Sequence, residues 1–172
     1  MEGGTGMSTR QIAYASLLAA VYVIVGRFVT QFLPNPMVPG AIIAINMVVV
    51  VIAGILFGPT VGAFVGLVGT LVNAVLSPSG SRAFEFAAII PHTIMGLTAG
   101  LLARINWAVA AFAIIVGHLL NILVFVLVKL LPVNQMALTI FSVGLLVETV
   151  IDLIVIWLVV ALLRPRVGSA MA

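Results

Sequence analysis

The sequence predicts an all-α integral membrane protein, a bundle of six transmembrane helices. Of its 172 residues, 64% are hydrophobic and only 6% are charged, whereas a soluble domain carries about 25% charged residues. Each spanning helix needs about 20 apolar residues, so this length accommodates about six spans joined by short loops. No length remains for a separate soluble domain.

Proline, glycine and short polar stretches divide the apolar sequence into six segments. The breakers are Pro34-Asn35-Pro36, Gly58-Pro59, a polar turn at residues 77–81, a link at residues 104–106 and a polar stretch at residues 132–135. The expected helices are residues 11–33, 41–57, 60–76, 84–103, 107–130 and 136–163. They form one domain over residues 11–166, between a flexible lead (1–10) and a C-terminal tail (167–172).

The cations predict that both termini are cytoplasmic, because lysine and arginine accumulate on the inner side of a membrane. With the N-terminus inside, four cations are cytoplasmic and two are outside. The inner four are Arg10, Arg104, Arg164 and Arg166, and the outer two are Arg82 and Lys129. Trp107 and Trp157 then lie toward the inner leaflet, as interfacial aromatic residues do.

Polar side chains inside the expected helices are the candidates for a substrate site, because an ionised group at the bilayer centre costs roughly 2.5 to 3.5 kcal/mol. The nine candidates are Arg27, Gln31, Asn46, Asn73, Glu85, His92, His118, Asn121 and Glu148. Several are three, four or seven residues apart and therefore share a helical face. We expect them to line a hydrated cavity in the outer half, with His118 and Glu148 near the midplane. The inner halves are nearly all apolar, which favours a binder over a channel.

Structural roles are the alternative for some of these residues. Arg27 can reach the outer headgroups, and Asn73 and Glu85 can lie at helix ends. His118 and Glu148 can form a hydrogen bond between helices. Asp152, the deepest, is expected to be a structural or gating partner.

The mixed chemistry of the candidates suits a small polar heterocycle that donates and accepts hydrogen bonds. Phenylalanines near them in sequence could stack on such a ring; these are Phe28, Phe32, Phe84 and Phe86. A strictly anionic ligand would need more cations. His92, His118 and Glu85 could in principle bind a metal, but no compact His/Glu motif supports one, so neither metal nor cofactor is expected.

Other function classes lack support. The seven lysines and arginines are scattered, which disfavours nucleic-acid binding. The absence of cysteine excludes disulfides and thiolate chemistry. Enzyme motifs and a phosphate-binding glycine loop are also absent from the sequence, so the protein is not expected to be an enzyme, and ATP hydrolysis would have to come from partners.

Small residues four apart predict close helix packing in lipid. The pairs are Ala15 and Ala19, Gly62 and Gly66, Gly96 and Gly100, and Ala99 and Ala103. Most are expected to pack within the bundle. The pair in the first helix could instead be an external docking face.

The layout resembles the substrate-specific S-components of energy-coupling factor (ECF) transporters, which are ABC importers of vitamins and other micronutrients. The resemblance depends on six helices in a chain of this length, on Ala15-x-x-x-Ala19, and on the Gly-Pro-x-x-Gly-Ala stretch within residues 53–66. It implies a multi-pass protein of a bacterial or archaeal cell membrane. Such a protein binds one vitamin or precursor beneath the outer loops, here residues 34–40, 77–82 and 131–135.

The resemblance also implies partners. The first helix, through Ala15 and Ala19, would dock on a transmembrane coupling protein that carries two ATPases, and the S-component would topple to release its cargo inward. The candidate residues do not align cleanly with the ligand residues of thiamin, riboflavin, biotin or folate binders, so the substrate stays open, with a lean toward thiamin-related or other nitrogen heterocycles.

Two other functions stay open. In an ion-coupled secondary transporter of a small polar solute, Glu148 and Asp152 would be proton sites, although such carriers usually contain internal repeats. In a structural membrane subunit, the polar residues would only join helices.

Overall fold

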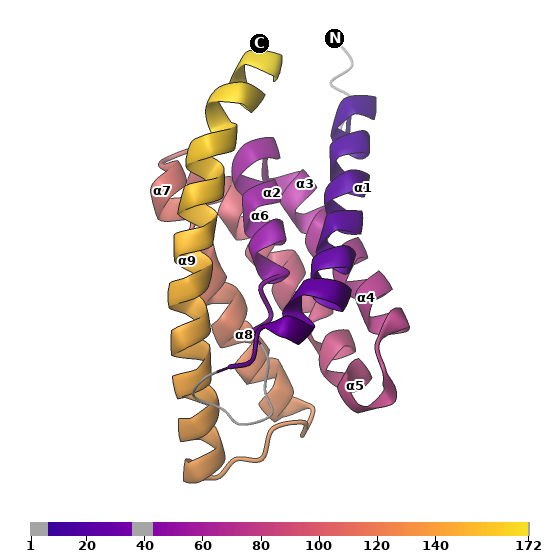
Figure 1. Cartoon of the computed structure of the whole chain (residues 1–172), viewed down its shortest axis with the longest axis vertical. Coiled ribbons are helices and arrows are strands. Elements are labelled where there is room, and N and C mark those ends of the chain that lie inside the picture. Colours follow the sequence, from indigo (N-terminus) through magenta and orange to yellow (C-terminus); the bar gives the residue numbers. More distant parts are fainter. Residues whose placement is uncertain (1–6, 36–42, 172) are drawn as a thin grey trace.

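The computed structural model describes residues 7–35 and 43–171, and over these residues the protein is helical with no strands (Figure 1). The first segment consists of α1 (Thr9–Ile24), the π-helical turn η1 (Val25–Val29) and η2 (Thr30–Phe32). The second is α2 (Met47–Phe57), and the third is α3 (Pro59–Phe64), η3 (Val65–Gly69) and α4 (Thr70–Leu76). The fourth is α5 (Ser79–Ala87) and α6 (Ile89–Ala103), the fifth α7 (Trp107–Ala110) and α8 (Ala113–Leu127), and the last α9 (Gln135–Met171).

Length and composition confirm an all-α membrane protein. Four continuous helical stretches are long and apolar enough to cross a bilayer: Thr9–Phe32, Pro59–Leu76, Trp107–Leu127 and Ser142–Val167. Helices α5 and α6 form a fifth span if they are taken together, although they are bent by 46°. The apolar α2 is shorter, and the start of the expected second helix at residues 41–42 lies outside the described residues. The count of six crossings therefore stays a prediction.

Several expected boundaries differ from the structure. The expected second helix starts at residue 41, but α2 begins at Met47 and the described residues 43–46 before it are not helical. The sequence predicts a polar turn over residues 77–81, but α5 already begins at Ser79. The extended Pro78 precedes its first turn, and proline at this place is compatible with a helix start because the first N–H groups have no partner within the helix. The last helix continues past residue 163 to Met171 with Pro165 inside it.

Gly58 and Pro59 separate the second and third segments, as the sequence predicts. Gly58 adopts a φ of 94°, a left-handed conformation that glycine tolerates without steric cost. Pro59 then occupies the first turn of α3. The tight reversal brings α3 back against α2, and both helices pack on α6.

Helix α2 lies at the centre of the bundle, with nine of its eleven residues buried. Glycines allow the neighbouring backbones to approach closely. A Cβ atom on Gly62 would clash with the carbonyl oxygen of Gly96, and one on Gly96 would clash with the carbonyl oxygen of Gly62. A Cβ on Gly66 would likewise meet the carbonyl group of His92. These glycines are packing residues, as the sequence predicts, and they fix the position of α6.

The beginning of α1 and the end of α9 lie at the same end of the bundle, which we call the terminal end (Figure 1). Aromatic and cationic side chains meet there. The Arg164 guanidinium lies 5.8 Å from the centre of the Trp107 ring, and the Trp157 indole N–H donates to the carbonyl of Ala108 at 3.0 Å. This pattern is typical of a membrane interface. Which side of the membrane it faces stays a prediction.

Candidate functional site: a polar pocket away from the termini

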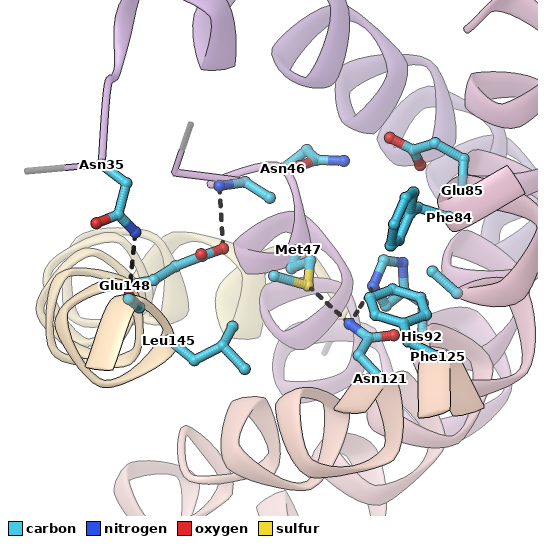
Figure 2. A pocket seen from close by; sticks show the side chains of 13 residues that line it. Asn35, Asn46, Met47, Phe84, Glu85, His92, Asn121, Phe125, Leu145 and Glu148 are labelled. Carbon is cyan, nitrogen blue, oxygen red and sulfur yellow. Dashed lines mark hydrogen bonds between the residues drawn. The ribbon is translucent and has the colours of Figure 1, made fainter. Parts of the chain in front are cut away.

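A pocket opens among α2, α5, α6, α8 and α9 in the half of the bundle away from the terminal end (Figures 1 and 2). The described residues that line it are Asn35, Ala44, Asn46, Met47, Phe84, Glu85, Ala88, His92, Asn121, Phe125, Gly144, Leu145 and Glu148. Polar groups from five of the six helical segments or their flanks thus converge on one cavity with apolar walls, the usual composition of a small-molecule site.

His92 on α6 forms the centre of a buried hydrogen-bond network. One ring nitrogen, Nδ1, lies 3.0 Å from the hydroxyl of Tyr22 and 2.9 Å from that of Thr70. The other, Nε2, lies 3.2 Å from the side-chain nitrogen of Asn121. Asn121 also approaches the sulfur of Met47 at 3.7 Å. The network joins α1, α4, α6 and α8, so the polar floor of the pocket is held in one arrangement.

A second group of contacts holds the opposite wall. A Glu148 carboxylate oxygen accepts the backbone N–H of Ala44 at 3.0 Å, and the Asn35 amide donates to the carbonyl of Gly144 at 3.2 Å. Figure 2 shows both contacts on the side of the pocket opposite Glu85. They attach α9 to the chain that leads into α2.

Two aromatic side chains, Phe84 and Phe125, form part of the pocket wall. Phe84 and Phe125 meet edge to face, with ring centres 5.2 Å apart at 87°, and Figure 2 places both rings beside His92 and Asn121. Such rings offer a surface on which a planar ligand can stack. Phe84 is among the expected aromatic residues. The other three, Phe28, Phe32 and Phe86, are exposed and do not line the pocket.

Five of the nine candidate residues meet in the pocket: Asn46, Glu85, His92, Asn121 and Glu148. The other four do not line it. Arg27 donates to the Ser77 hydroxyl at 3.0 Å, and the exposed Gln31 donates to the Arg27 carbonyl. Asn73 is buried, and its side chain contacts the carboxyl group of Glu85.

His118, the remaining candidate, lies apart from the lining residues. It faces Asp152 on α9, with 3.5 Å between Nε2 of His118 and a carboxylate oxygen of Asp152. Both side chains are buried. Asp152 is thus packed against another polar side chain in the bundle, and it does not line the pocket.

The expected docking strip of Ala15 and Ala19 lies largely on a buried face of α1. Both are buried, with 0% and 6% of their surface exposed, and they share a face of α1 with the buried Tyr22. Ala15 therefore packs within the bundle, whereas Ala19 also lines a shallow surface groove, so docking through this pair stays a prediction. The exposed face of α1 instead carries Ser16 and Ala20, another small pair four residues apart.

Sequence reasoning missed Asn35, Met47 and Phe125 among the lining residues. Phe125 could have been found, because it follows Asn121 by four residues and therefore lies on the same face of α8. Asn35 lies between two prolines and looks like part of a helix breaker. Of the expected outer loops, residues 36–40 lie outside the described residues.

Comparison with known proteins places the chain in a family. The family model for the ECF-type riboflavin transporter, S component, matches residues 6–167, nearly the whole chain. No curated protein and no solved structure matches it significantly. The match agrees with the apolar helices, which suit a multi-pass protein of a prokaryotic cell membrane. The chain therefore belongs to the ECF-type riboflavin transporter S-component family, whose members are vitamin-capturing transporter subunits and not enzymes.

Proposed function

We propose that the chain captures riboflavin, or a closely related flavin, in the pocket formed by α2, α5, α6, α8 and α9. The observation that carries the proposal is the convergence of Asn46, Glu85, His92, Asn121 and Glu148 on one cavity in a member of this family. With the terminal end cytoplasmic, this cavity opens toward the outside. A subunit of an importer would encounter its substrate there.

The chemistry of the pocket suits an uncharged flavin. The fused rings of riboflavin are flat, and the edge-to-face pair of Phe84 and Phe125 offers a surface for stacking. The ring edge both donates and accepts hydrogen bonds, as the Asn46 and Asn121 amides do. The hydroxyl groups of the sugar chain can donate hydrogen bonds, and the carboxylate oxygens of Glu85 and Glu148 can accept them.

Release of the vitamin into the cell requires partners in this proposal. A transmembrane coupling protein with two ATPases would supply the energy, and α1 would dock on it. We place this contact on the exposed face that carries Ser16 and Ala20, because small residues let a partner helix approach closely. A shallow apolar groove adjoins this face, lined by Ser16, Ala19, Ala20, Val23, Ile24, Phe64, Val68 and Val72.

The test is a titration of the purified full chain in detergent with riboflavin, followed by the change in flavin fluorescence. We expect saturation at one riboflavin per chain, with no competition from thiamin or biotin. Uptake in liposomes should need the coupling protein and ATP. Absence of riboflavin binding would reject the substrate. Uptake by the chain alone would support the ion-coupled carrier instead.

A further inference from the structure

Three buried titratable side chains meet between α8 and α9: His118, Glu148 and Asp152. One ligand atom of each lies within 4.8 Å of the other two, and the exposed fractions of the three residues are 3%, 5% and 0%. We call this group the acid–histidine cluster. Glu148 also lines the pocket, whereas His118 and Asp152 lie outside its lining.

The hydrogen bonds around Thr149 determine the protonation of the His118 ring. The Thr149 hydroxyl donates its single hydrogen to the carbonyl oxygen of Leu145 at 2.7 Å. It can therefore only accept from His118, whose Nδ1 lies 2.6 Å away. Nδ1 carries the hydrogen, and in the neutral ring Nε2 presents a lone pair.

The lone pair on Nε2 of His118 faces the carboxylate of Asp152, whose oxygens also carry lone pairs. Nε2 of His118 lies 3.5 Å from a carboxylate oxygen of Asp152. Neither this nitrogen nor either Asp152 oxygen has a hydrogen-bond partner among the described residues. Buried acceptors without donors are costly, and two carboxylates in a membrane interior need compensating positive charge. The arrangement therefore calls for a positive species between the two side chains.

The separation favours a metal ion over a shared proton. A charge-assisted hydrogen bond would bring nitrogen and oxygen to about 2.7 to 2.9 Å. Two ligands that each lie roughly 2.0 to 2.1 Å from a tetrahedral ion are about 3.3 Å apart, close to the observed 3.5 Å. A divalent ion with two carboxylates is also electrically neutral, which suits a membrane interior.

We propose that His118, Glu148 and Asp152 bind a divalent transition-metal ion, such as Zn²⁺ or Co²⁺, between α8 and α9. Imidazole favours these ions over Mg²⁺ and Ca²⁺. One Glu148 oxygen receives the N–H of Ala44, which leaves the other oxygen for the ion. The donation from Nδ1 of His118 to Thr149 is the outer contact that usually orients a metal-binding histidine.

Metal binding to the full chain tests the proposal directly. The protein is purified in detergent, treated with a chelator and titrated with Zn²⁺, Co²⁺, Mg²⁺ and Ca²⁺ without riboflavin. We expect one ion per chain and a Co²⁺ absorption spectrum of nitrogen and oxygen ligation. Asp152→Asn and His118→Gln should each weaken binding at least about 100-fold. Thr149→Val, which removes only the outer contact, should weaken it roughly 10 to 100-fold.

Glu85→Gln is the matched control, because it neutralises a pocket carboxylate that is outside the acid–histidine cluster, and it should keep wild-type metal affinity. Wild-type protein without a stoichiometric ion would show that the cluster holds protons only and would overturn the proposal. So would unchanged binding by Asp152→Asn, or a preference for Mg²⁺ or Ca²⁺. Riboflavin titration of the same samples, with and without metal, keeps this outcome separate from the proposed vitamin function.

Discussion

Asn121 on α8 and His92 on α6 face each other at the floor of the pocket, with 3.2 Å between the amide nitrogen and Nε2 of the ring. The far side of the same ring meets Tyr22 from α1 and Thr70 from α4. One imidazole thus links four helices. A floor assembled in this way is rigid before any ligand enters, which reduces the entropy lost on binding.

Asn121→Ala should weaken riboflavin binding by roughly 5 to 150-fold, the equivalent of one lost buried hydrogen-bonding partner at about 1 to 3 kcal/mol. Fluorescence titration of the purified variant measures the change. Gln31→Ala is the control, because Gln31 is exposed and does not line the pocket. Equal affinities of the two variants would place the binding site elsewhere.

Riboflavin 5′-phosphate should bind more weakly than riboflavin. Glu85 is the acidic residue of the described pocket lining that lies outside the acid–histidine cluster, and a phosphate group brought near its carboxylate is repelled in an environment of low dielectric constant. Parallel titrations with the two flavins measure the ratio. Glu85→Gln should reduce this preference. A phosphate form that binds as tightly as the vitamin would contradict the proposed pocket chemistry.

Ala20→Trp should abolish co-purification with the coupling protein and its ATPases while leaving riboflavin affinity and the thermal midpoint unchanged. Ala20 is exposed on α1, so a large ring there meets a partner and not the bundle. The neighbouring variant Ala19→Trp should behave differently. Ala19 is buried, and overpacking typically costs about 1 to 3 kcal/mol, so its thermal midpoint should fall. Normal assembly of Ala20→Trp would reject docking on this face.

Gly96→Val should destabilise the bundle strongly. Even a Cβ atom at this position would clash with the carbonyl oxygen of Gly62, which belongs to the backbone and cannot turn aside. A lower thermal midpoint and aggregation in size-exclusion chromatography are expected. Gly80→Ala serves as the control because a Cβ there meets nothing within 4 Å. A stable, monodisperse Gly96→Val protein would mean that α3 and α6 are less closely packed.

Much of the fold could be predicted from the sequence, because proline and glycine act locally. Gly58 and Pro59 end one helix and begin the next whatever surrounds them. The start of α5 could not be read in the same way. Ser79, Gly80 and Ser81 have turn-like composition, yet they form the first turn of a helix.

The convergence of several polar residues on one pocket could be predicted, but the full set of lining residues could not. Position along the helices predicted His92 and Asn121 in the outer half and Glu148 near the midplane, and the structure brings these three residues to one pocket. The sequence alone does not show which face of a helix points into the bundle. Ala15 and Ala19 therefore suggested a surface, although a shift of one residue, to Ser16 and Ala20, gives the exposed pair.

The acid–histidine cluster shows a second limit. His118 and Asp152 are 34 positions apart in the sequence, on different helices, and no motif joins them. Only the packing of α8 against α9 brings them together. A search for short metal-binding motifs therefore passes over this group.

The arginines at the terminal end have an electrical consequence. Arg10, Arg104, Arg164 and Arg166 are exposed there, and in the predicted orientation they face the negative interior of the cell. Carrying one charge across a membrane potential of 100 mV costs about 2.3 kcal/mol, so moving all four outward would cost about 9 kcal/mol. A polarised membrane thus resists inversion of the bundle but permits tilting that leaves these four groups among the inner headgroups.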